Sequence, residues 1–352
     1  MDDQSAATGA HLAPRPGLVV PVRRDKAGRV GPSFNSARGP LWRASSHGWY
    51  VPASVELTPE QRVVEAAAVL PEHGGVTGWA GLRWLRGRWF DGNGAGGAPR
   101  PVTLVTAGDD IRAQPGIAVS AERLDPRDLI EVDRVRLTHA VRCTWFEARY
   151  AQSLRDAVVA IDMAAYDDLV SLVELTKWSV EHPGWTGAPQ FRAALALARE
   201  NAWSPREVDL RLVGEVLAEL PRLLCNRPIF DRATGALLGT PDLLDLEAGL
   251  AIEYDGPDHL KLVQRSRDVR REELFRRHGL EVLTVLSPDM RNRQALAARM
   301  VAARERARFQ AESMRSWTIG HPSWWIPTHT VELRRALTEK ERVRVLRYRR
   351  AA

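Results

Sequence analysis

Carboxylates stand inside a segment that otherwise looks like buried strand, the stretch GTPDLLDLEAGLAIEYDGPDHL at residues 239–260. Its two apolar runs, separated by EAG, predict a β-hairpin. Side chains alternate along a strand, so Glu253 and Asp255 share one side, and Asp242 converges with Glu253 if the register is right. Carboxylates so close repel at neutral pH unless a cation or raised pKa values stabilise them, which favours a hard ion such as Mg²⁺. Alternatively, Asp242 and Asp245 lie at strand ends and face water.

Further groups suited to phosphodiester chemistry follow the hairpin. His259 comes just after the second strand, and QRSRDVRREELFRRHGLEVLTVL then predicts a basic helix, a break at Gly279 and a strand. A solvated face is the common reason for such an arginine run, and proximity to a phosphodiester is the functional alternative. The arginines concerned are Arg267, Arg270, Arg271 and Arg277. The predicted order is strand, strand, helix, strand, with acidic residues on the hairpin. This order is typical of a nuclease core.

A helix is predicted ahead of the hairpin, over SPREVDLRLVGEVLAEL. Ser204 and Glu207 have the spacing of a capping box, so Glu207 either caps the helix or adds a carboxyl group to the acidic site. The expected buried stripe recurs every fourth residue, with Glu207, Arg211 and Glu215 beside it. That stripe consists of Val208, Leu212, Val216 and Leu220.

The order of these features resembles a known superfamily. From Ser204 to about Asp289, a quarter of the chain, acids, hairpin, glycine and basic helix follow one another as in the PD-(D/E)XK, restriction-endonuclease-like proteins. The segment looks closest to the branch related to very-short-patch repair endonucleases. The resemblance implies a three-layer α/β/α domain that hydrolyses phosphodiester bonds with a metal-activated water.

The resemblance also assigns roles to the acids. Asp242 and Glu253 become the ligands of Mg²⁺ or Mn²⁺, and the backbone carbonyl of Tyr254 completes the metal shell. Glu207 becomes the accessory acid of the first helix.

Two positions depart from the superfamily pattern. Asp255 stands where the superfamily generally has a lysine, but the nearer branch tends to have Asp there with a downstream histidine, a role that His259 fills. His259 would then position or deprotonate the water, while Lys261 or Arg271 steadies charge on the phosphate. Thr284 stands where an arginine is common in the final strand. A domain that keeps the fold but cuts slowly or not at all is therefore the alternative.

The N-terminal part has a different character. Residues 1–55 are rich in Gly, Pro, Ser and Arg and predict an irregular arm with short strands. Thr58 and Gln61 predict the capped start of a helix, and Thr77 that of a second helix. The glycine-rich RWFDGNGAGGAPRPVTLVT that follows has the outline of a wing returning as a strand.

Two stretches, HGGVTGWAGLRWLRG and RCTWFEARYAQSLRDAVVAIDMAA, resemble AbiEi-type winged-helix antitoxin modules, which are often fused ahead of such nuclease domains. The resemblance implies a winged-helix-like α+β module with a helical extension and a cognate toxin or defence-system protein as partner. Two helices joined by a glycine turn more often only pack together within a protein than bind DNA. By the same reasoning, Trp79, Trp84 and Trp89 more often fill a core than touch bases.

The expected class is therefore α/β. We predict an arm at 1–55, the winged-helix module at 56–185, the nuclease-like domain at 190–312 and a basic tail at 313–352. From Val331 the tail holds eight basic and three acidic residues, which either lie along phosphates or form a solvated terminus. In HPSWWIP, Trp324 and Trp325 either dock on the protein or stack on bases. Docking is the favoured interpretation.

Composition limits the function classes. Lys plus Arg number 50 against 44 Asp plus Glu, and the dominance of Arg suits phosphate contacts, although a GC-rich genome gives the same bias. Two cysteines provide neither a disulfide framework nor a zinc site, which favours a reducing cytoplasm. No apolar run approaches the roughly 20 residues that span a bilayer, so no membrane partner is expected. The N-terminus is acidic and polar, unlike a signal peptide.

Two functions follow. The first is a Mg²⁺-dependent DNA endonuclease, in DNA repair or phage defence. The second is a non-catalytic DNA-binding regulator or antitoxin-like protein that keeps the nuclease fold as a scaffold. RNA remains a weaker alternative substrate. Both hypotheses predict DNA affinity, and they differ in whether Asp242 and Glu253 must bind a metal.

Overall fold

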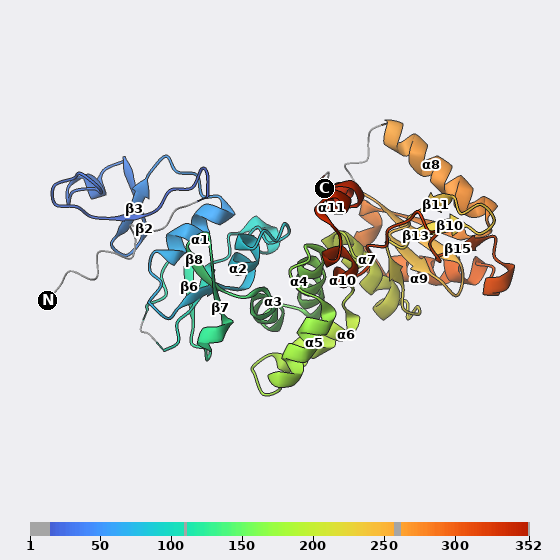
Figure 1. The fold of residues 1–352 in the computed structure, drawn as a ribbon, viewed down its shortest axis with the longest axis horizontal. Helices are drawn as coiled ribbons and strands as arrows, with labels where there is room; N and C mark the ends of the chain where they lie inside the picture. Colours follow the sequence, from blue (N-terminus) through green and yellow to red (C-terminus); the bar gives the residue numbers. More distant parts are fainter. Residues whose placement is uncertain (1–14, 109–110, 257–261, 351–352) are drawn as a thin grey trace. The chain divides into compact units, whose positions relative to one another are not determined.

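The computed structural model describes residues 15–108, 111–256 and 262–350, and Figure 1 shows its fold. The chain forms two compact units. The first runs up to Gln152 and includes Glu174–Arg192, while the second contains Ser153–Val173 and the residues from Ala193 on. Both units combine helices with sheets, so the predicted α/β class is confirmed. In the described part of the chain, no helix has the length and apolar character needed to cross a membrane.

Short strands are present in the N-terminal arm, as predicted. They form an antiparallel sheet of order β1-β3-β2, with Trp49 and Val51 of its central strand buried. Its strands are β1 (Val22–Arg23), β2 (Trp42–Ser46) and β3 (Trp49–Pro52), with a 3-10 turn at Ser36–Arg38.

A five-stranded mixed sheet of order β6-β5-β4-β8-β7 forms the centre of the first unit. The central strand β4 is antiparallel to β5 and parallel to β8. The strands are β4 (Gly75–Thr77), β5 (Val102–Val105), β6 (Ile117–Ser120), β7 (Leu129–Val132) and β8 (Val135–Thr138).

The first two helices only partly follow the sequence prediction. Helix α1 (Pro59–Ala67) begins as expected, because Thr58 Oγ1 accepts from Gln61 N at 3.1 Å. Helix α2 (Gly78–Trp84) follows Thr77, but the Thr77 hydroxyl does not cap it and instead bonds to Thr138 Oγ1 at 2.8 Å. Strand β4 lies between the helices, so they are not joined by a turn alone.

The tryptophans of this region belong mainly to the core. Trp79 and Trp84 are buried, and their indole N–H groups donate to the carbonyls of Pro101 and Val132, each at 2.8 Å. Trp89 is only half-buried. The core reading is thus confirmed for Trp79 and Trp84.

The segment Glu174–Arg192, which belongs to the first unit, packs on helix α3 (Ala140–Arg149). Trp145 meets Phe191 edge-on, with 4.4 Å between ring centroids, and Gln190 Nε2 donates to the carbonyl of Ala148 at 3.0 Å. Helices α5 (Leu172–Glu181) and α6 (Ala188–Leu197) carry this segment.

The second unit contains the predicted hairpin. In its four-stranded sheet of order β14-β13-β12-β9, β12 and β13 are antiparallel with Leu244 opposite Ala251, while β13 and β14 are parallel with Glu253 opposite Thr284. The strands are β9 (Leu224–Cys225), β12 (Leu243–Asp245), β13 (Leu250–Asp255) and β14 (Glu281–Leu286). A smaller sheet consists of β10 (Ile229–Asp231), β11 (Leu237–Gly239) and β15 (Trp317–Thr318).

Helix α8 (Leu262–Arg277) and Gly279 lead into β14, which confirms the predicted helix, break and strand. Gly279 has φ +87°, a conformation that glycine adopts without steric cost. Phe275 of α8 is fully buried in a cluster with Leu244, Ala251 and Val282, so α8 covers that face of the sheet. Helix α9 (Arg293–Arg306) also packs on β14, and Figure 1 shows α8 and α9 on opposite sides of β13.

The predicted stripe of the helix before the hairpin is wrong at Val216, although Val208 and Leu220 are buried as predicted. Helix α7 (Pro205–Leu212) continues as a π-helical turn at Val213–Leu217, which shifts the phase of the side chains. Val216 is therefore 49% exposed, while Val213 is buried. Arg211, expected beside the stripe, is fully buried and pairs at 2.7 Å with Asp162 of helix α4 (Leu154–Tyr166).

The basic C-terminal segment is folded on the second unit and does not form a solvated terminus. Asp168 accepts ion pairs from Arg334, Arg342 and Arg349 at 2.5, 3.3 and 2.9 Å. These arginines are therefore engaged within the protein. The segment forms α10 (Val331–Arg335), α11 (Glu339–Val345) and a 3-10 turn at Arg347–Arg350.

Candidate functional site

The two central acids lie opposite each other on the β12–β13 hairpin. The register pairs Leu243 with Ile252, so one further step places Asp242 opposite Glu253. Residues directly opposite in an antiparallel pair share a face of the sheet. Asp242 is fixed there, because its Oδ2 accepts a hydrogen bond from Tyr254 N at 2.7 Å. Asp242 lies in the bend just before β12, and this hydrogen bond places its carboxylate beside the backbone of β13, next to Glu253.

Glu253 is only 8% exposed, and its charge is balanced from helix α8. Arg271 Nε donates to Glu253 Oε1 at 2.9 Å, and the Arg271 Nη2 group contacts Oε2. Such a two-point pair is strong and directional. Arg271, expected to contact phosphate, is therefore a partner of Glu253 in this structure.

Glu207 is buried at the start of α7 and held by three donors. Trp203 N and Asn226 Nδ2 donate to its Oε2 at 2.8 and 2.6 Å, and Ser204 Oγ donates to Oε1 at 3.1 Å. Ser204 Oγ also accepts from Glu207 N at 3.2 Å, so Ser204 caps the helix, while the Glu207 side chain accepts from the backbone N of Trp203, the residue before the cap. Burial, and secondly the nearby charge of Asp242, raise the pKa of Glu207 to about 8. Glu207 is thus mostly protonated at neutral pH and senses Asp242 electrostatically.

Asn226 joins these groups and was missed from the sequence. Its backbone N donates to the Asp242 carbonyl at 2.9 Å, while its side chain donates to Glu207 and, at 2.8 Å, to the Asn201 carbonyl. Its φ of +46° is a left-handed conformation that Asn adopts more readily than most residues. An asparagine directly after an apolar strand was the available signal.

The remaining predicted residues are dispersed. Asp255 ends β13 and is exposed, and Arg270 is exposed on α8. Arg267 also falls on α8. His259 and Lys261 lie outside the described residues, so their predicted roles stay predictions.

The donors present fit a hard cation. Mg²⁺ typically binds through one or two carboxylates and takes its other oxygens from water and substrate phosphate. Asp242 and Glu253 supply that number, whereas Glu207 is protonated and hydrogen-bonded. Within residues 15–108, 111–256 and 262–350, no group of three or more His, Cys, Asp or Glu side chains is arranged as a metal site.

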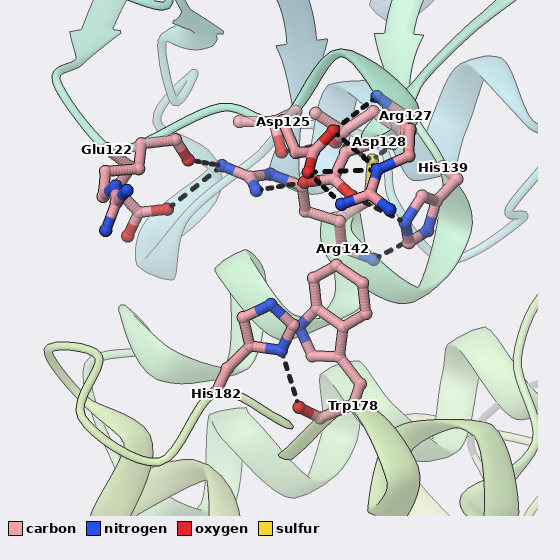
Figure 2. A network of polar contacts seen from close by, with 12 residues as sticks. Glu122, Asp125, Arg127, Asp128, His139, Arg142, Trp178 and His182 are labelled. Atoms are coloured by element: carbon pink, nitrogen blue, oxygen red, sulfur yellow. Dashed lines mark hydrogen bonds and ion pairs between the residues drawn. The ribbon is translucent and has the colours of Figure 1, made fainter. Parts of the chain in front are cut away.

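A second polar cluster lies in the first unit, as Figure 2 shows. Arg142 Nη1 donates to Asp128 at 2.6 Å, and His139 Nε2 lies 3.6 Å from the same carboxylate. His139 meets the edge of Trp178, which stacks on His182 with 4.1 Å between ring centroids. The cluster links α3 to helix α5. Its contacts hold these two helices together, which is a structural role.

Compared with protein-family models, with curated proteins and with solved structures, the chain matches none.

Proposed function

We propose that the protein is a metal-dependent endonuclease that hydrolyses phosphodiester bonds in DNA. The observation that supports it most is the placement of Asp242 opposite Glu253, with Asp242 held by the N–H of Tyr254. Mg²⁺ or Mn²⁺ bound there would polarise a phosphate oxygen and activate water. The order α7, β12, β13, α8, β14 supports a restriction-endonuclease-like α/β/α domain.

The chain's own residues would prepare the site in two ways. Arg271 balances the charge of Glu253 before substrate binds. When a negatively charged phosphate binds, the guanidinium of Arg271 would turn from Glu253 to contact it. Glu207 stays neutral and hydrogen-bonded, which limits the repulsion on Asp242. The first unit, with α1, α2 and the glycine-rich segment after them, would contribute an AbiEi-like winged-helix module that contacts DNA or a cognate toxin or defence protein.

The test is cleavage of supercoiled plasmid with Mg²⁺, with Mn²⁺ and with EDTA. We expect nicked or linear products that require metal, and at least a 100-fold slower reaction for Asp242→Asn with DNA binding retained. Asp133→Asn is the matched control, because Asp133 is exposed in the first unit and its φ of +47° suits asparagine. Equal behaviour of wild type and Asp242→Asn at all metal concentrations would reject the enzyme.

The second candidate, a DNA-binding scaffold, is favoured by one observation. Glu253 is already neutralised by Arg271, and Glu207 by protonation, so the fold does not need a metal to tolerate its acids. A scaffold predicts that Asp242→Asn and Glu253→Gln leave DNA affinity and all function unchanged, with no cleavage by the wild type.

A further inference from the structure

A cavity of about 350 Å³ lies in the second unit beside the acidic site. It shares Trp203 and Asn226 with that site, since both donate hydrogen bonds to Glu207. Thr240, two residues before Asp242, also lines it. A ligand in the cavity would therefore reach towards the carboxylates.

The walls of the cavity are aromatic. Trp203, Trp324 and Trp325 line it, and Trp325 is seated on Phe230 with 5.2 Å between ring centroids. Trp324 meets Trp325 edge-on at 5.7 Å yet remains 58% exposed. Both rings contact Phe230, so the predicted docking on the protein is confirmed, and Trp324, whose ring centroid lies 5.9 Å from that of Phe230, still presents a large apolar surface to the cavity and to solvent.

The ionisable side chains that line the cavity are all basic. Arginine and histidine side chains contribute, and none of the described lining residues is acidic. The basic residues are Arg227, His321, His329, Arg344 and Arg347. Burial, and secondly the charge of Arg227, lower the pKa of His329 to about 4, so His329 is neutral near pH 7 and serves as a hydrogen-bonding group.

Arg227 is the distinctive cation. Its side chain is half-buried, and its Nε is a buried donor that finds no hydrogen-bond acceptor in the described part of the chain. Burial lowers the pKa of Arg227, and no carboxylate of the described residues offsets this effect. A half-buried guanidinium with an unsatisfied buried N–H lowers stability, and an anion bound beside it would offset that cost. Arginine beside an aromatic wall suits a ligand that has both a planar ring and a phosphate.

We propose that this cavity binds one unstacked nucleotide of the nucleic acid substrate, with its base against Trp324 and Trp203 and a phosphate at Arg227. The inference rests on the proposed function for the class of ligand. The volume falls at the small end of ligand pockets, which admits a single nucleotide and excludes a duplex. A base reaches such a pocket only from a single strand or after leaving the helix.

The experiment measures binding of the full-length protein in EDTA, so that cleavage plays no part. A fluorescein-labelled single-stranded oligothymidylate and a blunt duplex of equal length are titrated by anisotropy. We expect Trp324→Ala and Arg227→Gln each to weaken single-strand binding about tenfold or more, as loss of a base stack or a buried phosphate contact does. Arg291→Gln, an exposed arginine of the same unit, is the matched control and should stay within twofold.

The outcomes separate this inference from the catalytic one. Unchanged single-strand affinity in Trp324→Ala and in Arg227→Gln overturns the nucleotide pocket, whatever the plasmid assay gives. Weakened binding in both variants supports the pocket, even if the wild type fails to cut plasmid and the nuclease is rejected. Thermal melting guards against misfolding, and Trp324→Ala should melt like the wild type because its side chain is largely exposed. Binding of thymidine monophosphate without binding of the strand also overturns the inference, in favour of a free nucleotide.

Discussion

Asp242 accepts a hydrogen bond from the backbone N–H of Tyr254, 2.7 Å away, and this bond fixes the first acid of the site on the strand that carries the second. Because a main-chain donor makes the contact, the position of Asp242 does not depend on the side chain of Tyr254. The hairpin is thus a rigid support for two acids whose environments differ.

Replacing Arg271 should change metal and DNA affinity in opposite directions. Arg271 balances Glu253 in the present structure, so Arg271→Ala leaves the carboxylate more negative and more available to a cation. We expect the Mg²⁺ concentration for half-maximal cleavage to fall several-fold, while DNA affinity weakens through loss of a positive charge. Magnesium titrations of plasmid cleavage and mobility shifts check both. Arg277→Ala, which breaks an exposed pair with Glu273, should change neither by more than twofold. A rise in the magnesium requirement would contradict the expectation.

Glu207 should make stability depend on pH. Its pKa of about 8 in the folded protein exceeds the ordinary value of 4.5, so the folded state retains a proton that the unfolded state releases. This contribution to stability is fully present below about pH 4.5 and is lost as the pH rises towards 8. We expect Glu207→Gln, which stays neutral, to remove that slope. Urea midpoints of both proteins from pH 5 to 9 test it, and parallel curves would show that Glu207 is ionised at neutral pH.

The local pattern of the second unit could be predicted from the sequence. The apolar runs around EAG, the arginine-rich stretch and Gly279 each depend on neighbours a few residues away, and the structure has the predicted hairpin, helix, break and strand. The N-cap at Ser204 was equally local. Alternation along paired strands then brought Asp242 and Glu253 together without further information.

The contacts that could not be predicted join distant residues. Asp162 and Arg211 are 49 positions apart in the sequence, and Asp168 and Arg334 are 166 apart. No local sequence pattern indicates which arginine pairs with either carboxylate. The pairing of Arg271 with Glu253 depends on how α8 lies across β13, which periodicity does not fix. The π-helical turn after α7 also has no recognisable signal in an apolar helix and shifted the buried stripe.

Breaking the pair between Asp162 and Arg211 should be severely destabilising. Both side chains are fully buried and lie 2.7 Å apart, and Arg211 also pairs with Glu215 at 3.1 Å. Removing Arg211 therefore takes the paired charge from buried Asp162, which among the described residues keeps only its hydrogen bond from Arg199 N. We expect Arg211→Met to lower the free energy of unfolding by about 3–5 kcal/mol. The double variant Asp162→Leu with Arg211→Met should lose less than the sum of the single losses, because it leaves no unpaired charge. Urea denaturation of the four proteins gives the coupling, and strict additivity would show that the pair does not act as a unit.

Asp168 should hold the C-terminal segment on the second unit. Its carboxylate contacts Arg334, Arg342 and Arg349, and the first of these is fully buried. Asp168 itself has φ +60°, which asparagine also tolerates, so Asp168→Asn removes the charge without backbone strain. We expect the residues from Val331 on to become sensitive to trypsin, with cleavage at least tenfold faster than in the wild type. Asp167→Asn, the neighbouring acid, is the control. If trypsin released the segment equally slowly from both variants, the arginines would be held by their backbone contacts, such as that of Arg334 with the Ala165 carbonyl at 2.7 Å, and not by the shared charge.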